Sequence, residues 1–145
     1  SCLLGEPLTV HGDGSASRDW IYAEDTVRAI DLSIHAPRES VVGEAFNIGT
    51  GMALSILEIA KNILQEFGLK DDRLDFMIDR FGQVQKHISS VEKAEKVFGF
   101  KASVTFEEGL QKTINWYKDN RMFWEKQVMM RKVPVKTQDG STIWY

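Results

Sequence analysis

The sequence predicts a small mixed α/β domain, and three observations lead to this prediction. Short apolar segments with the length of strands lie at residues 8–11, 45–48 and 74–78. Longer segments at 55–67 and 106–117 carry apolar residues at the spacing of helices. Strand-like and helix-like segments are separated by turns, but they do not form a regular βαβ series. We therefore expect an irregular α/β unit with short strands.

The first third of the chain predicts a strand, a turn and a helix. A strand at 8–11 leads into a turn at 12–15, where glycine and aspartate tolerate the positive φ of tight turns. Residues 20–22 are apolar and expected to be extended. Asp25 is expected to cap a helix that stops before Pro37. This helix carries three apolar residues at helical spacing on one face: Val27, Ile30 and Ile34.

The middle of the chain contains the clearest predicted helix. A buried strand at 45–48 and a turn at 49–51 precede it. Ser55 and Glu58 have the spacing of a capping box, in which each side chain bonds the backbone amide of the other. An apolar stripe follows on one helical face, and Gly68 is expected to end the helix.

The last predicted elements are shorter. A strand at 74–78 precedes an irregular, polar-rich connection that is extended near 84–89. Ser90 is expected to start a short helix through Val97, with Gly99 at its end. Thr105 and Glu108 form a second capping box before the helix at 106–117. Two regions are therefore expected: residues 1–120 as one domain, and residues 121–145 as a helical extension and tail.

Composition excludes several functional classes. A chain of 145 residues with net charge −3 fits one ordinary domain and does not predict a surface that binds polyanions. Cys2 is the only cysteine, so neither an internal disulfide nor a zinc site built on cysteines is possible. No apolar segment approaches the length of a membrane span. A cytoplasmic protein is expected, because a lone cysteine is typical of a reducing compartment.

The segment "GTGMAL" follows a predicted strand and precedes a helix, as a dinucleotide-binding loop does. It lacks the third glycine, which such loops need for close packing of helix and strand. We therefore interpret it as a tight turn, which still leaves open that the turn borders a ligand.

Arg18 and Arg80 each lie in a turn beside a predicted strand. A guanidinium group matches phosphate oxygens with two parallel donors, so two arginines on converging loops would hold a diphosphate. Surface salt bridges are the alternative interpretation for each arginine. The three histidines are far apart in sequence and lack the spacing of metal ligands.

Three ordered segments carry a family resemblance: "GEPLTVHGDGSASRDWIYAEDTVRAI", "FNIGTGMALSILEIAKNIL" and "DRFGQVQKHISSVEKAEKVFGFKASVTFEEGLQKTINWY". Together they resemble the C-terminal, substrate-binding half of NAD-dependent sugar-nucleotide epimerases, dehydratases and decarboxylases, which are extended short-chain dehydrogenase/reductase proteins. The resemblance implies a small α/β domain that packs on an NAD-binding Rossmann domain.

The resemblance also implies roles for individual residues. Arg18 matches the arginine that binds the nucleotide diphosphate, and Arg80 matches a second arginine on the same diphosphate. Phe81 stands where the family often has proline. The remaining implied contacts are Gln83 at the ribose, Thr9 and His11 at the nucleobase, and Trp20 and Met52 along the nucleotide.

The family's catalytic Tyr-x-x-x-Lys pair and its glycine-rich cofactor loop do not occur in this sequence. No catalytic or cofactor-binding residue is therefore expected here, and an N-terminal half of the parent protein would bind NAD. The expected ligand is a UDP- or dTDP-sugar, and the expected full-length protein is a homodimeric enzyme. The chain alone is expected to be inactive. A stand-alone nucleotide-binding module and a purely structural domain are the alternatives.

Overall fold

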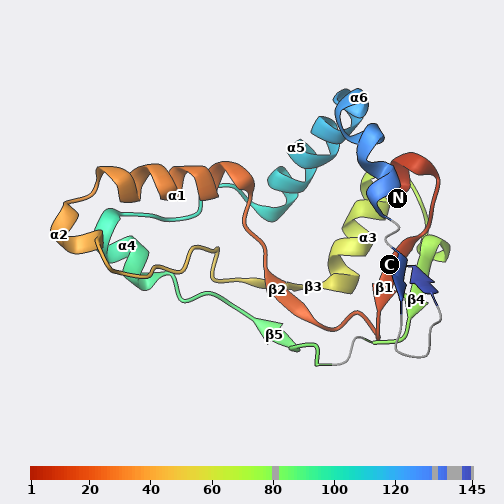
Figure 1. Ribbon diagram of the computed structural model, residues 1–145, viewed down its shortest axis with the longest axis horizontal. Coiled ribbons are helices and arrows are strands. Elements are labelled where there is room, and N and C mark those ends of the chain that lie inside the picture. Colours follow the sequence, from red (N-terminus) through yellow and green to blue (C-terminus); the bar gives the residue numbers. More distant parts are fainter. Residues whose placement is uncertain (80–81, 132–133, 137–141, 145) are drawn as a thin grey trace. The chain divides into compact units, whose positions relative to one another are not determined.

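The computed structural model describes residues 1–79, 82–131, 134–136 and 142–144, and it confirms the mixed α/β class. The chain divides into two compact units, Ser1–Gln111 and Lys112–Tyr145. Figure 1 shows the elements of the first unit, which are η1 (Cys2–Leu4), β1 (Leu8–His11), β2 (Ser17–Asp19), α1 (Ala23–His35), α2 (Arg38–Val41), β3 (Ala53–Ser55), α3 (Ile56–Glu66), η2 (Asp71–Arg73), β4 (Leu74–Met77), β5 (Lys86–His87), α4 (Glu92–Phe98) and the start of α5 (Phe106–Asp119).

Two small sheets organise the first unit. Strands β1 and β4 are parallel, with Leu8 opposite Leu74 and His11 opposite Met77. The second sheet has the order β3-β2-β5, and its central strand β2 is antiparallel to β3 and parallel to β5. The predicted strands at 8–11 and 74–78 and the extended segment near 84–89 are thereby confirmed. The strand near the predicted extended residues 20–22 instead lies at Ser17–Asp19.

Helix α3 begins as the sequence predicts. The Ser55 hydroxyl accepts a hydrogen bond from the Glu58 amide at 3.1 Å, and the Glu58 carboxylate accepts one from the Ser55 amide at 2.8 Å. This reciprocal pair satisfies two amides that a helix start otherwise leaves unpaired. The helix buries Ala60 and Leu64, which belong to the predicted apolar stripe.

The main apolar cluster lies between α1, α4 and the residues that follow α4. Ala29, Ala94 and Phe100 are buried at its centre. Partly buried apolar side chains surround them: Ile21, Leu32, Phe46, Ile48, Phe98 and Ala102.

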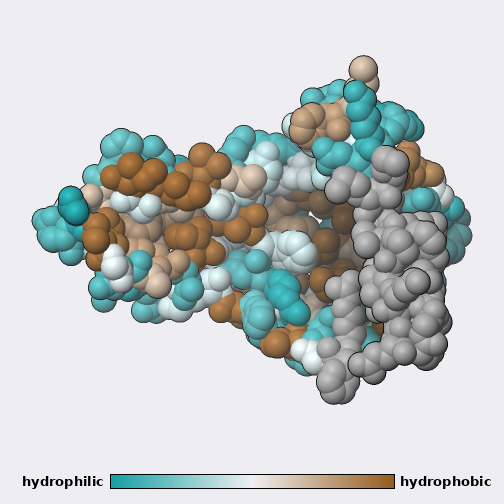
Figure 2. All heavy atoms as spheres, viewed as in Figure 1, coloured by the Kyte–Doolittle hydropathy of each residue, from teal (hydrophilic) through white to brown (hydrophobic). Residues whose placement is uncertain are grey.

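Helix α1 differs from the prediction in two ways. Its buried face contains Ala29, whereas the predicted apolar face is exposed, as the brown surface along α1 in Figure 2 shows. The exposed fractions on that face are 66% for Val27, 55% for Ile30 and 71% for Ile34.

Asp25 does not cap α1, which corrects the second prediction for this helix. Tyr22 occupies the N-cap position and makes no side-chain capping bond. Asp25 is instead buried, with 1% of its surface exposed, and it binds the backbone of residues 103 and 104. A carboxylate in the first helical turn can be drawn to amides of another segment, and sequence spacing does not distinguish the two cases.

The predicted strand at 45–48 is wrong, although its predicted burial is partly right. Phe46 and Ile48 pack against the main cluster. A strand needs a neighbouring strand to complete its hydrogen-bond ladder, and none pairs with this segment among the described residues. Helix α4 also begins later than predicted, at Glu92 with Val91 as its N-cap, so Ser90 is not its start.

The second unit continues α5 into α6 (Arg121–Trp124), η3 (Glu125–Arg131), and the antiparallel strands β6 (Pro134–Lys136) and β7 (Thr142–Trp144). The ring of Trp116 packs edge-on against those of Tyr117 and Phe123, with centroids 5.1 and 5.7 Å away. The Trp124 indole donates a hydrogen bond to the Tyr117 carbonyl oxygen at 2.7 Å. The chain after Asn120 is thus helical at Arg121–Trp124 and 3-10 helical at Glu125–Arg131.

Candidate functional site

Arg18 lies on β2 and lines a cavity of about 470 Å³. Its guanidinium donates a hydrogen bond to the carbonyl oxygen of Ser17 at 2.7 Å, and the side chain is half-buried. Among the described residues, no carboxylate forms an ion pair with Arg18, although Asp19 is its neighbour in sequence. A simple surface salt bridge therefore does not account for Arg18 in the part of the chain that is described.

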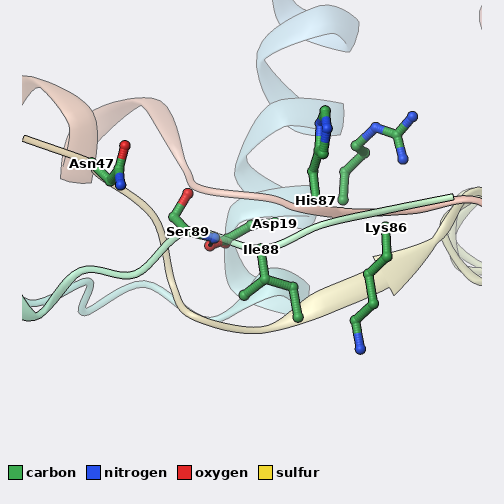
Figure 3. Close-up of a pocket in the computed structure, with 7 residues that line it drawn as sticks. Asp19, Asn47, Lys86, His87, Ile88 and Ser89 are labelled. Atoms are coloured by element: carbon green, nitrogen blue, oxygen red, sulfur yellow. Dashed lines mark hydrogen bonds between the residues drawn. The ribbon is translucent and has the colours of Figure 1, made fainter. Parts of the chain in front are cut away.

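The cavity is formed where β2 and β5 lie side by side. Arg18 and His87 are directly opposite each other in this parallel pair, and Ser17 is opposite Lys86. Figure 3 shows His87 and Lys86 pointing to opposite sides of β5. The remaining residues that line the cavity are Asp19, Asn47, Ile88 and Ser89.

His87 is one of the three histidines of the sequence, and the sequence alone does not place it beside Arg18. The two residues are far apart in the chain, and only the parallel pairing of β2 with β5 brings them together. The one local signal was the predicted extended segment near 84–89, which did not identify its partner strand.

Asp19 connects three segments next to the cavity. Its carboxylate accepts hydrogen bonds from the Thr50 amide at 2.8 Å, the Gly51 amide at 3.0 Å and the Ser89 amide at 3.3 Å. The Thr50 hydroxyl donates a further bond at 2.6 Å. Burial alone would raise the pKa of Asp19, but the bonds from Thr50, Gly51 and Ser89 outweigh it and lower the pKa below its usual range. The carboxylate therefore remains ionised near neutral pH.

The glycines of the 49–51 turn serve this connection. A Cβ atom on Gly49 would lie 2.8 Å from the Ser89 Cβ and 2.9 Å from the Asp19 Cγ, so only glycine fits there. The amides of Thr50 and Gly51, which a dinucleotide loop would offer to a pyrophosphate, are bonded to Asp19 instead. The turn therefore does not fit the phosphates of NAD, in agreement with its interpretation as a tight turn.

A second cavity, of about 400 Å³, brings together two other predicted site residues, Trp20 and Met52. Both are exposed, with 41% and 69% of their surfaces accessible. Other residues that line this cavity are Thr50, Ala53, Leu54 and those of the 102–107 segment. The Thr50 hydroxyl also donates a hydrogen bond to Asp19, which lines the first cavity, so this bond joins the walls of the two cavities.

The other predicted site residues lie elsewhere. Thr9 and His11 are on β1, where a His11 ring nitrogen is 3.3 Å from the Ile78 carbonyl oxygen. Gln83 is half-buried between Gly82 and β5. Neither cavity is lined by these three residues. Arg80, and Phe81 beside it, lie outside the described residues.

The described ranges lack two further features. No group of three or more histidine, cysteine, aspartate or glutamate side chains is arranged there to hold a metal ion. No helix in the same ranges is long and apolar enough to cross a membrane.

Residues 2–113 match the sequence pattern of the GDP-mannose 4,6 dehydratase family. The low-salt glycan biosynthesis protein Agl12 of Haloferax volcanii is 40% identical over 113 residues, which cover 78% of this chain and 35% of that protein. The dTDP-glucose 4,6-dehydratase of Streptomyces niveus is 34% identical over 138 residues, which cover 95% of this chain and 38% of that enzyme.

Solved structures share the fold. The dTDP-glucose 4,6-dehydratase of Bacillus anthracis, crystallised with NAD, matches with a TM-score of 0.78 at 31% identity, over 86% of this chain and 39% of that one. The UDP-glucose 4-epimerase of Thermotoga maritima, crystallised with UDP-glucose, matches with a TM-score of 0.74 at 32% identity, over 82% of this chain and 37% of that one. The chain thus spans less than two fifths of the length of these relatives. Because the family pattern covers most of the chain and the fold agrees with it, the protein belongs to the GDP-mannose 4,6 dehydratase family of extended short-chain dehydrogenase/reductase proteins.

Proposed function

We propose that this chain is the nucleotide-sugar-binding part of an NAD-dependent sugar-nucleotide epimerase, dehydratase or decarboxylase. Arg18 is its diphosphate-binding residue. The ligand is a UDP- or dTDP-sugar, since relatives are named for enzymes that act on both kinds. The parent protein binds NAD outside this chain and works as a cytoplasmic homodimer, with residues 1–120 as its substrate-binding domain and 121–145 as an extension.

One observation carries this proposal: Arg18 lines a cavity with two further basic side chains, Lys86 and His87, while the acid beside it bonds backbone amides. The local balance of charge is positive although the chain as a whole is acidic. A guanidinium fork that keeps donors without a partner among the described residues suits the oxygens of a diphosphate. Arg80 is proposed as the second diphosphate ligand on the strength of the family motif alone.

Arg18→Ala is expected to weaken the binding of UDP-glucose or dTDP-glucose by about tenfold to a hundredfold. A charge-assisted hydrogen bond contributes roughly 1.5–3 kcal/mol, and alanine removes the donors without leaving a buried charge. Isothermal titration calorimetry or NMR titration of the purified chain with each nucleotide sugar measures the change.

Arg38→Ala is the matched control, because it removes the same charge from the exposed helix α2, away from the cavity. Its affinity should stay within about twofold of the wild-type value. Equal affinities of the Arg18 variant and the wild-type chain would contradict the proposal, as would a wild-type chain that binds neither nucleotide sugar.

The isolated chain is expected to show no turnover of UDP- or dTDP-sugars in the presence of NAD. The sequence contains no Tyr-x-x-x-Lys pair, and the Gly49–Gly51 turn does not fit the NAD phosphates. Chromatographic analysis of the sugar products after long incubation tests this expectation. Conversion by a pure and intact preparation would show that the chain holds catalytic groups that the family resemblance does not assign.

A further inference from the structure

His87 on β5 and Leu54 on β3 are the two residues directly opposite Arg18 across the sheet, and His87 is the polar one. The parallel register places the two residues opposite each other, and opposed residues of adjacent strands project from the same face. Lys86 precedes His87 and points to the other side of β5 (Figure 3). Arg18 and His87 therefore present their nitrogen atoms on one face, while the Lys86 ammonium lies on the opposite one.

The charged groups around this face differ in how they respond to pH. Arg18 supplies a guanidinium group and Lys86 an ammonium group to the cavity, and neither kind of group ordinarily changes its charge between pH 5 and 8. Asp19 stays ionised in that range, because hydrogen bonds lower its pKa. His87 supplies the one imidazole among the residues that line this cavity, and imidazole is the side-chain group that proteins generally use to respond to pH between 5 and 8.

We propose that protonated His87 is a second donor to the diphosphate that Arg18 binds, so that nucleotide-sugar affinity rises as pH falls. This inference rests on the proposed function of the same cavity. Two adjacent positive groups repel each other when the cavity is empty, and an anion between them relieves the repulsion. Neutral imidazole still offers one N–H donor, so binding weakens at high pH without being lost.

Nucleotide sugars are suitable probes for this effect. Each phosphate of UDP-glucose is a diester, so its diphosphate keeps two charges from pH 5 to 8. Any pH dependence of affinity in that range then arises from the protein. Titration calorimetry of the 145-residue chain at pH 5.5 and 8.0 should show binding about fivefold tighter at pH 5.5, the size expected for one exposed charge.

In the His87→Gln variant, the affinities at pH 5.5 and pH 8.0 should be about equal, because glutamine keeps a donor but does not titrate. Its affinity at both pH values should match that of the wild-type chain at pH 8.0. Lys86→Gln is the matched control: it removes a charge that lines the same cavity from the other side of β5, so it should lower affinity equally at both pH values and preserve the ratio. In NMR spectra at pH 6.5, the His87 ring resonances should shift when UDP-glucose is added.

The inference is overturned if His87→Gln retains the wild-type ratio, if Lys86→Gln abolishes it, or if the His87 resonances do not move. A flat pH profile together with weaker binding by Arg18→Ala removes the role of His87 and leaves the proposed function intact. If the wild-type chain binds no UDP-glucose at either pH, both the role of His87 and the proposed function are wrong.

Discussion

Replacing Asp25 by asparagine is expected to lower the free energy of unfolding by about 2–4 kcal/mol. The carboxylate is buried and accepts hydrogen bonds from the Ser103 and Val104 amides, both at 2.9 Å. The Ser103 hydroxyl donates to it at 2.9 Å, and Arg28 donates at 2.6 Å. An asparagine side chain would turn an NH₂ group toward one set of these donors, which would leave buried amides without acceptors. Urea denaturation at pH 7 measures the loss.

The same contacts predict how stability depends on pH. Burial alone would raise the pKa of Asp25, but bonds from Val104, Arg28 and Ser103 outweigh it and lower the pKa from 3.8 to about 2. A group whose pKa is lower in the folded chain stabilises it fully above the unfolded value, near pH 4, and the contribution is lost as pH falls toward 2. The difference in unfolding free energy between the wild-type chain and Asp25→Asn should therefore shrink as pH falls from 4 to 2.

Asp31→Asn on the same helix is the control for Asp25. The Asp31 side chain is 68% exposed, and its contact with His35 is 3.4 Å long. Its unfolding free energy at pH 7 should change by less than about 0.5 kcal/mol. If the two variants were equally stable, the buried carboxylate would not hold α1 to the 103–104 segment.

Gly49→Ala is expected to cost about 2–3 kcal/mol of stability and to weaken nucleotide-sugar binding. The added methyl group would press on Asp19 and Ser89, and moving Asp19 breaks its bonds to the 49–51 turn. Asp19 adjoins Arg18 on β2, so the wall of the cavity shifts with it. Denaturation and titration with UDP-glucose measure the two losses on one preparation.

Gly43→Ala separates steric from conformational effects. Gly43 has a φ of 81°, and a Cβ atom added there would meet nothing within 4 Å. Its substitution should cost only about 1 kcal/mol, the strain of a left-handed backbone in alanine, and should leave binding unchanged. A Gly49 variant as stable as the wild-type chain would contradict the close packing around Asp19.

Features whose cause lies within a few residues were predictable from the sequence. The Ser55–Glu58 capping box was placed correctly because both partners lie in one helical turn. Gly99 ends α4 with a φ of 70°, as a helix-terminating glycine does. The tight turn at 49–51 was also predicted from local spacing, whereas the bond from the Gly51 amide to Asp19 was not.

Features that depend on distant partners were not predictable. Asp19 and Asp25 both look like ordinary loop or capping acids, and their partners lie 31 and 78 residues away in the chain. The apolar segment at 45–48 predicted burial, but a strand also requires a neighbour that the segment itself does not specify. The position of His87 opposite Arg18 follows from strand register, which no local pattern of a two-residue strand encodes.

The parallel pairing of β1 with β4 has a consequence for the order of folding. Leu8 pairs with Leu74, so this contact closes a loop that contains nearly half of the chain. Closing such a loop costs chain entropy before any contact compensates for it, whereas α3 forms from neighbours within single turns. Helices of the first unit are therefore expected to form early, and the two parallel strand pairs late. The Arg18–His87 face depends on one of those late pairs, so it is assembled near the end of folding.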